Sequence, residues 1–503
     1  MTPEREQHLL AEIARLKAEN ELLRQKLDLI IRQLFGKKSE TLDPAQLELL
    51  PEIDAAKKAL AAEPEDPGPA AEPPAKQKRG PRKPRDLSHL EVRETLLVRD
   101  EVLADPDNFR EMTRVTTDRL DYQPAVIFIN RLTRLVHIAL DDPDAVPLKV
   151  PAPPSLGLGA TPRLVAYILA AKYCHHRPFY RSQVILGQRH GVDLPRNTFC
   201  HWADCVADWL EPLYKLIHAA LLERDHLQAD ETPIRYLAPG RGKCAMGYLW
   251  VIHGPDQGTK GDILYQWHPS RKAACLNDLL GNYQGFLQTD AYVAYDSWAS
   301  DKQDITLFSC WAHARRKFHE AFVVGQPLAA GPLATIQQLY QIETTLRQAR
   351  AGPAERLATR QARAAPLLEI LNAELVVLRQ NPAVLPKSLL GKAIAYTLGL
   401  WEKLRVYLRE GVLEIDNNGI ENGMRPIAIG KKNWLFIGGE TTGQRSAIIY
   451  TLIECARRHG HNPEAYLADI LERLPTMTNQ DDLGALLPSR WQPATALAPV
   501  PAH

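Results

Sequence analysis

Apolar residues near the amino terminus recur at alternating spacings of four and three. The series is Leu9, Ile13, Leu16, Leu23, Leu27, Ile30 and Leu34, with Asn20 in the apolar frame. This heptad repeat predicts a leucine-zipper-like coiled coil within residues 1–50, and an Asn at a core position favours a two-stranded, in-register pair. An amphipathic helix packed against its own domain would produce a similar pattern. We expect a homodimer or a higher oligomer formed through this coiled coil.

A segment without apolar periodicity follows. Residues 51–87 are rich in Ala, Pro and Glu and end in KQKRGPRKPR, which holds six cations and no acid. This composition cannot bury a core, so it predicts a linker whose basic end either contacts phosphates or only keeps the linker soluble. In residues 88–150, alternating segments such as VIFINRLTRLVHIAL predict a small β-containing module.

The pattern becomes helical in residues 151–225. One predicted helix ends near His190, a glycine turn follows, and Pro195 suits the start of a second helix. A helix-turn-helix would present the polar residues at the start of its second helix to base edges or phosphates. These residues are Arg196, Asn197, Thr198 and His201. A plain helical hairpin without a role in DNA binding would have the same pattern.

Strand patterns dominate residues 226–325. The segments HLQADETPIRYL, MGYLWVIHG, GDILYQWHPS and GFLQTDAYVAYDSW predict four strands, with a helix at about 271–282 before the fourth. Three neighbouring strands, a helix and another strand is the order of a ribonuclease-H-like sheet. In that fold, a carboxylate in the first strand lies beside one at the end of the fourth, and Asp230 and Asp290 occupy these positions.

The remaining residues complete the predicted architecture. Repeated Leu, Ala, Arg and Gln predict helices in residues 326–410, which we interpret as an insertion into the catalytic fold. Residues 411–476 would form its second part and residues 477–503 a tail. The predicted fold class is multidomain α+β: a coiled coil, a helix-turn-helix-like region, and a ribonuclease-H-like α/β domain with a helical insertion.

Composition limits the possible functions. The 503 residues include 45% hydrophobic and 24% charged side chains, so several cores can form, and a net charge of +1 gives no general attraction to an anionic partner. The seven cysteines lie at or after Cys174 without a CxxC pair, which argues against a disulfide framework or zinc ribbon and fits a reducing cytosol. Neither a signal core nor a long apolar run is found. We therefore expect a cytoplasmic protein without a membrane partner.

The carboxylates suggest a specific chemistry. Clustered carboxylates hold two Mg²⁺ ions in enzymes that cleave phosphodiester bonds by a two-metal mechanism. Two strand carboxylates would leave such a cage open on one side, and a third from a helix would close it. Glu421 lies among amides and cations in DNNGIENGMRPIAIGKKNWLF, although a solvated helix face could have this composition too.

Four motifs occur in the order and wording of a known family. They are ADETP, TDAYVAYD, CWAHARRKF and DNNGIENGMRPIAIGKKNWLF. On these motifs the chain resembles the insertion-sequence-66-type transposases, the large DDE subunit of those bacterial elements. The resemblance extends to LFGKKSE and RPFYRSQVILGQRHGVDLPRNTFCHW and covers most of the chain from residue 9 to about 470.

The resemblance implies roles for individual residues. Asp230 matches the family's first catalytic aspartate, Asp290 the second, and Glu421 the glutamate of its Asn-Asn-x-x-Glu motif, so that these three would hold two Mg²⁺ or Mn²⁺ ions. It also implies that His313 lies near the catalytic centre. DNA contacts are expected from cations that accompany these motifs: Arg315, Arg316, Lys317, Arg425, Lys431 and Lys432. Trp434 would either pack in the core or stack on a base.

The chain departs from the family pattern in two ways. Asn422 follows Glu421 where arginine is usual, which would weaken a phosphate contact. Residues 1–173 lack the cysteines of the family's zinc-binding module, although RLDYQPAVIFI keeps its wording, so the module would fold without metal and no zinc is expected. The six-residue spacing of His313 and His319 also suits zinc poorly. We assign no role to His175 or His176.

The sequence therefore predicts a magnesium-dependent DDE transposase. It would bind terminal inverted repeats, cleave a phosphodiester bond and join the 3′-hydroxyl end to target DNA, in the bacterial cytoplasm at the nucleoid. Small accessory proteins of the same element would be further partners. The alternative is a weakened or domesticated transposase that acts as a sequence-specific DNA-binding protein. A nuclease without strand transfer would share the same site.

Overall fold

The computed structural model describes residues 127–130, 136–137, 148–149, 153–238, 243–255, 261–478 and 480–493. The coiled coil predicted for residues 1–50 and the linker 51–87 lie outside these residues. In the module predicted for residues 88–150, the described strands β1 (Val136–His137) and β2 (Leu148–Lys149) form an antiparallel pair. Within the described part of the chain, no helix has the length and apolar character needed to cross a membrane.

A mixed five-stranded sheet positions two of the predicted catalytic residues, Asp230 and Asp290. Its order is β5-β4-β3-β6-β7, with parallel β3–β6 and β6–β7 pairs and antiparallel β3–β4 and β4–β5 pairs. The bounds are β3 (His226–Leu237), β4 (Cys244–His253), β5 (Ile263–His268), β6 (Gly285–Thr289) and β7 (Ile305–Ser309). The predicted first strand is confirmed at both ends, whereas β7 was not expected.

The fourth predicted strand is only partly a strand. Strand β6 ends at Thr289, Ala291 has a φ of 69°, and helix α9 (Val293–Ala299) follows. The prediction of a strand through residue 298 is wrong because Ala294, Tyr295 and Trp298 have helical spacing and are buried on one face of α9. Helix α8 (Cys275–Leu280) lies within the predicted 271–282 helix but is shorter.

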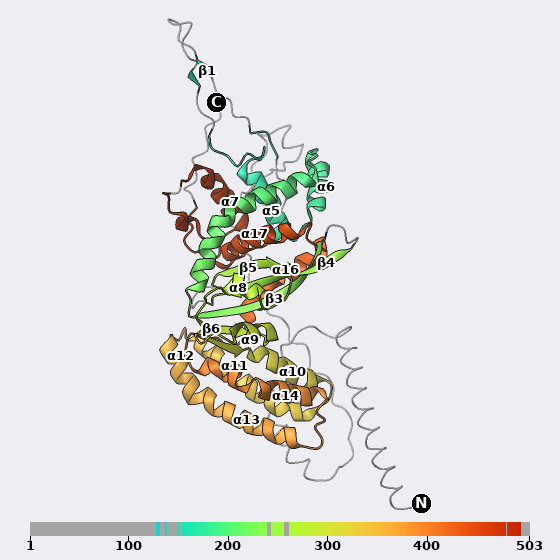
Figure 1. Cartoon of the computed structure of the whole chain (residues 1–503), viewed down its shortest axis with the longest axis vertical. Helices are drawn as coiled ribbons and strands as arrows, with labels where there is room; N and C mark the ends of the chain where they lie inside the picture. Colours follow the sequence, from blue (N-terminus) through green and yellow to red (C-terminus); the bar gives the residue numbers. More distant parts are fainter. Residues whose placement is uncertain are drawn as a thin grey trace, which may run out of the picture. The chain divides into compact units, whose positions relative to one another are not determined.

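Six helices of at least 11 residues share one hydrophobic core with the sheet. They are α5 (Pro162–Tyr173), α6 (Phe179–His190), α7 (Arg196–Leu222), α16 (Asn418–Trp434), α17 (Glu440–Arg458) and α18 (Pro463–Arg473), with short 3₁₀ turns Leu474–Thr476 and Leu483–Leu486 after them. Figure 1 shows α5, α7 and α17 on the β5 side of the sheet. Gly191 ends α6 in the left-handed region, at a φ of 63°, as expected for a glycine C-cap. The predicted helix pair is confirmed, and Phe199, Trp202 and Val206 are buried.

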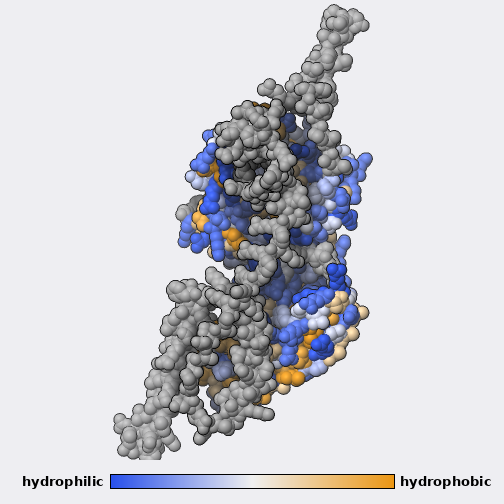
Figure 2. All heavy atoms as spheres, turned by 180° about the vertical axis from the view of Figure 1, so that it is seen from behind, coloured by the Kyte–Doolittle hydropathy of each residue, from blue (hydrophilic) through white to orange (hydrophobic). Residues whose placement is uncertain are grey.

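A second hydrophobic cluster belongs to the helices between β7 and α16, which include the predicted helical segment 326–410. They are α10 (Trp311–Val323), α11 (Ala330–Gln348), α12 (Pro353–Thr359), α13 (Ala365–Gln380), α14 (Leu389–Gly399) and α15 (Trp401–Arg405), with 3₁₀ turns Pro327–Ala329 and Val406–Leu408 and a π-helical turn Arg360–Ala364. Figure 1 shows α10–α14 beyond β6, on the side of the sheet away from β5. Apolar side chains also reach the surface, as Figure 2 shows. Ile370 and Val377 of α13 are exposed.

A buried ion pair lies inside this helical segment. Arg360 is fully buried and donates through Nε and Nη2 to the two carboxylate oxygens of Glu343, at 2.7 and 2.9 Å. Its remaining donors bind the carbonyls of Tyr407, Glu410 and Leu413, at 3.1, 3.0 and 2.8 Å. The π-helical turn that starts at Arg360 therefore ties α11 to the chain that leads into α16.

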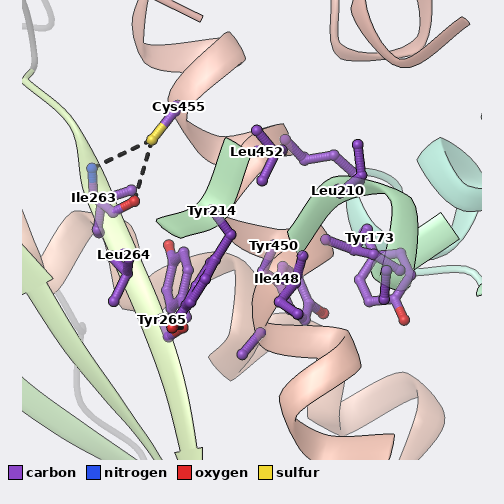
Figure 3. Packing of buried hydrophobic residues seen from close by; sticks show 14 of the residues in the cluster. Tyr173, Leu210, Tyr214, Ile263, Leu264, Tyr265, Ile448, Tyr450, Leu452 and Cys455 are labelled. Atoms are coloured by element: carbon purple, nitrogen blue, oxygen red, sulfur yellow. Dashed lines mark hydrogen bonds between the residues drawn. The ribbon is translucent and has the colours of Figure 1, made fainter. Parts of the chain in front are cut away.

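The outer edge of β5 is covered by side chains of α17. The backbone N–H groups of Ile263, Tyr265 and Trp267 donate to Cys455 Sγ, Thr451 Oγ1 and Gln444 Oε1, at 3.4, 3.1 and 3.0 Å. Figure 3 shows Cys455 beside Ile263, with Tyr214, Tyr265 and Tyr450 packed nearby. An edge strand normally exposes such donors to other chains, so α17 completes the sheet in the way that a sixth strand would.

Candidate active site

Strands β3 and β6 bring Asp230 and Asp290 to the same face of the sheet. The strands are parallel, with Gln228 opposite Gln288, and Gln228 Nε2 donates to Gln288 Oε1 at 2.8 Å. Side chains two positions apart in a strand point to the same face. Asp230 and Asp290 each lie two residues beyond this glutamine pair, so both aspartates extend from the face where the glutamines meet.

The two aspartates differ in their local setting. Asp230 lies within β3, is 8% exposed, and accepts a hydrogen bond from the backbone N–H of Glu231 at 2.7 Å. Asp290 directly follows β6 and accepts from the N–H of Tyr292 at 2.9 Å. Because β3 continues where β6 ends, Asp290 stands in a turn beside an uninterrupted strand.

Helix α16 presents Glu421 from its first turn. The chain before the helix is bound to the sheet, since the carbonyls of Asp416 and Glu414 accept from Gln228 and Gln288, at 2.8 and 3.0 Å. The N–H of Asn417 also donates to Cys310 Sγ at 3.4 Å, at the junction of β7 and α10. These bonds fix the start of α16 beside the first residues of β3 and the end of β6.

Two side chains of α10 face the Glu421 carboxylate. His313 Nε2 is 3.7 Å from Oε1, and an Arg316 Nη is 3.7 Å from Oε2. Both distances are ion-pair contacts longer than ordinary hydrogen bonds. Glu421 Oε1 is buried and, among the described residues, has no hydrogen-bond partner. The glutamate is therefore oriented by α10 while part of its acceptor capacity is unused.

Electrostatic interactions link the three predicted carboxylates. Burial raises the pKa of Asp230 well above its usual range, and the charges of Asp290, Glu231 and Glu421 raise it further. Burial also lowers the pKa of His313, an effect that the charges of Glu421 and Asp290 oppose. Asp230 is therefore close enough to both Asp290 and Glu421 to feel their charges.

The convergence fits a divalent cation in charge and in donor type. Carboxylate oxygens are the ligands that Mg²⁺ and Mn²⁺ prefer. The side chains do not form a closed ligand set: across the described residues, no three His, Cys, Asp or Glu side chains are grouped closely enough to hold a metal ion.

Glu231 is a buried acid that the sequence analysis overlooked. It accepts from Arg271 Nε at 2.7 Å and from the Tyr295 hydroxyl at 3.0 Å, and the Arg271 guanidinium lies 3.7 Å from the centre of the Tyr292 ring. These contacts tie β3 to the residues just after Asp290. The acid is visible in ADETP, but the sequence does not show which of the two neighbouring acids faces which side.

The predicted DNA-binding residues lie on three helices. Arg196, Asn197 and His201 are exposed and Thr198 is half-buried at the start of α7. On α10, Arg315, Arg316 and Lys317 are half-buried; Arg316 contacts Glu421, and Lys317 Nζ lies 4.5 Å from the centre of the Tyr396 ring. Arg316 and Lys317 are thus engaged by other side chains of the protein.

On α16, Lys431 Nζ donates to Thr232 Oγ1 and to the Pro233 carbonyl, at 3.2 and 3.1 Å. Its charge therefore lies along β3, just beyond Asp230. Lys432 and Arg425 are exposed. Trp434 is half-buried and packs against the hydrophobic core, the first of its two predicted settings.

Known proteins match most of the chain. The family model described as Transposase IS66 family matches residues 157–445, the IS66 C-terminal element matches residues 451–489, and Transposase C of IS166 homeodomain matches residues 22–95. Relatives from Sinorhizobium fredii (strain NBRC 101917 / NGR234) include Uncharacterized protein y4jD, 34% identical over 75% of both chains. Uncharacterized protein y4qI is 31% identical over 83% of this chain and 79% of its own length. Uncharacterized protein y4hP is 30% identical over 67% of this chain and 63% of its own.

The match to the Transposase IS66 family model alone spans more than half of the chain. Membership of this family implies transposase activity and DNA as a partner. The chain belongs to the IS66 transposase family.

Proposed function

We propose that this chain is a DDE transposase that holds two Mg²⁺ or Mn²⁺ ions through Asp230, Asp290 and Glu421. It would bind the terminal inverted repeats of its element, cleave a phosphodiester bond and join the resulting 3′-hydroxyl end to target DNA. When bound, the ions would activate the attacking oxygen and stabilise the departing one.

The observation that carries this proposal is the set of charges acting on Asp230. Its pKa is raised by burial first, and then by carboxylates that include Asp290 and Glu421, residues 60 and 191 positions away in the sequence. Like charges gathered at a half-buried site are unfavourable unless a cation neutralises them. Two basic side chains contact Glu421: His313, whose pKa is lowered by burial, and Arg316, each at 3.7 Å.

Other residues would position this set. His313 and Arg316 would orient Glu421, while Glu231, with Arg271 and Tyr295, would hold the turn that follows Asp290. Lys431 would add positive charge for a DNA phosphate next to Asp230. The order and directions of the five strands support a ribonuclease-H-like fold for this part of the chain.

Exposed polar residues at the start of α7 support a helix-turn-helix role in reading the inverted repeats. A coiled coil in residues 1–50 would join two copies, so that both ends of an element could be held together.

The test is cleavage of labelled DNA that carries the ends of the element. Wild-type protein should cut it with Mg²⁺, and Asp290→Ala should lose at least about 100-fold in rate, because metal stabilisation of developing charge contributes several kcal/mol. Asp301→Ala serves as the matched control, since Asp301 is 81% exposed in its side chain and pairs only loosely with Lys302 at 3.7 Å.

The outcomes separate the candidate functions. Metal-dependent cutting followed by joining to a second DNA supports the transposase. Specific binding without a cut, in the wild type and in Asp290→Ala alike, would instead support a DNA-binding protein derived from a transposase. Cutting that never leads to joining would indicate a nuclease.

A further inference from the structure

A basic cavity lies on the side of α16 that carries Asn422 and Arg425. Its volume is about 600 Å³, and its lining comes from α16, α17 and His176, which follows α5. Nothing in the sequence pattern indicated this cavity, and no role in it was assigned to His176. We call it the α16–α17 pocket.

The pocket has an excess of positive charge. Arg425, Arg457 and Arg458 line it together with a single carboxylate, Glu454. Arg457 and Arg458 each contact Glu454, at 2.9 and 3.4 Å, and Arg458 also donates to the Gly419 carbonyl at 2.9 Å. One carboxylate cannot neutralise three guanidinium groups, and no side chain in the described part of the chain pairs with Arg425.

His176 provides a second, independent sign of a binding site. It has a φ of 58°, in the left-handed region that residues with a side chain rarely adopt. Its Nδ1 is buried and, among the described residues, has no hydrogen-bond partner. Strained backbone and unsatisfied polar atoms cluster at binding sites because a ligand compensates for them.

The geometry of α16 relates the pocket to the candidate active site. Successive residues of a helix point about 100° apart. Glu421 faces α10, whereas Asn422, Arg425 and Ile429, spaced by three and four, form a stripe that lines the pocket. Helix α16 therefore carries a candidate catalytic carboxylate on one side, and its adjacent side lines a pocket that attracts anions.

We infer that a DNA strand adjoining the cleavage position crosses α16 and places a backbone phosphate in the α16–α17 pocket, against Arg425 and Arg457. This inference rests on the proposed transposase function. Arginine is suited to phosphate because its planar guanidinium donates two parallel hydrogen bonds. Pro426 and Ile429 form an apolar wall of the same pocket that suits the sugar of a nucleotide. A free inorganic anion has no apolar group that would contact Pro426 and Ile429.

The salt dependence of DNA binding tests the inference. Affinity of the full-length protein for a short fluorescein-labelled duplex is measured by anisotropy in EDTA, so that no cleavage occurs, between about 50 and 200 mM salt. Each phosphate contact contributes about 0.9 to the slope of log affinity against log salt. Arg425→Gln should reduce the slope by about one contact, so that wild type loses about three- to fourfold more affinity than the variant over this range.

Two further variants sharpen the comparison. Asn422→Arg adds a cation to the same stripe of α16 and should increase the slope by about one contact. Arg379→Gln removes an exposed arginine of α13, which the described residues leave without an ion-pair partner, and should leave the slope unchanged. Binding of inorganic phosphate to the wild type and to Arg425→Gln is measured by calorimetry in parallel.

The results expected for Arg425→Gln and Asn422→Arg together support the inference. Wild-type slopes in both variants would overturn it while leaving the transposase proposal intact. Phosphate binding that depends on Arg425, combined with an unchanged DNA slope, would also overturn it, because the pocket would then hold a free anion. If the wild type binds no DNA under any of these conditions, both proposals fail.

Discussion

Replacing Glu343 by glutamine would test whether the helical segment between β7 and α16 is held together by its buried ion pair. The Glu343 side chain is 1% exposed and Arg360 is fully buried, so neither charge can be neutralised by water. Burial alone would raise the pKa of Glu343, but its hydrogen bond and charge interaction with Arg360, aided by Arg356, lower it. The carboxylate is therefore ionised, and its removal leaves the Arg360 cation uncompensated.

The expected loss is large. Removing one partner of a buried pair typically costs about 3–5 kcal/mol. The amide oxygen of glutamine can still accept one hydrogen bond from Arg360, so we expect the lower end, about 3 kcal/mol. Because Arg360 also binds the carbonyls of Glu410 and Leu413, the variant should loosen the chain that leads to Glu421 and reduce DNA cleavage as well.

Urea unfolding followed by tryptophan fluorescence measures the loss, and hydrogen exchange of the amides in α11–α13 shows where it occurs. Glu369→Gln is the matched control, because Glu369 pairs with Arg405 at 2.9 Å on the exposed surface and such pairs contribute about 0–1 kcal/mol. The pKa shift also has a pH consequence. Since the folded pKa lies below 4.5, this stabilisation is present above the unfolded value and is lost as pH falls through the folded one. If Glu343→Gln costs no more than Glu369→Gln, the ion pair does not hold this segment together.

Three more substitutions test other parts of the structure. Thr451→Val leaves the Tyr265 N–H buried without an acceptor and should cost about 1–3 kcal/mol in urea unfolding. Thr335→Val is the control and should cost far less, because the Thr335 hydroxyl donates to the Gly331 carbonyl of its own helix. His226→Phe should make the free energy of unfolding less dependent on pH in acid. Burial lowers the pKa of His226 from 6.5 to about 3, so between these values the unfolded wild-type chain takes up a proton and its stability falls by about 1.4 kcal/mol per pH unit. Equal slopes for both proteins in this window would contradict the argument. Glu231→Gln should displace the turn after Asp290 and so lower the rate of DNA cleavage by about 10–100-fold, while DNA affinity in EDTA stays nearly unchanged. An equal loss of DNA affinity would show that the substitution disturbs more than this turn.

The sequence predicted the elements whose periodicity is strong and local. Strand β3 has the predicted bounds, and α6 and α7 meet at the predicted glycine turn, because glycine and proline follow the strand and mark the turn between the helices. It failed where periods of two and of three to four overlap, as in the residues after Asp290, where a turn with a positive φ cannot be read from Ala291. Strand β7 was missed because ITLFS is short and lacks flanking glycine or proline.

The candidate carboxylates were identified from motifs, and their convergence depends on contacts between residues far apart in the chain. Gln228 donates hydrogen bonds to both Gln288 and the Asp416 carbonyl, and no local sequence pattern predicts such long-range contacts. The same holds for Arg425. The structure shows it lining a pocket with Asn422, a neighbourhood that its motif does not indicate. Whether it binds DNA from that position remains a prediction.

Three side chains of α17 accept hydrogen bonds from the backbone N–H groups of β5, which has a consequence for truncated copies of the gene. Translation that stops before Gln444 would still produce all three candidate catalytic acids, but the donors of Ile263, Tyr265 and Trp267 would be left bare. A bare strand of this kind recruits strands from neighbouring molecules. Such shortened products should therefore precipitate or be degraded instead of persisting as soluble inhibitors of the intact protein.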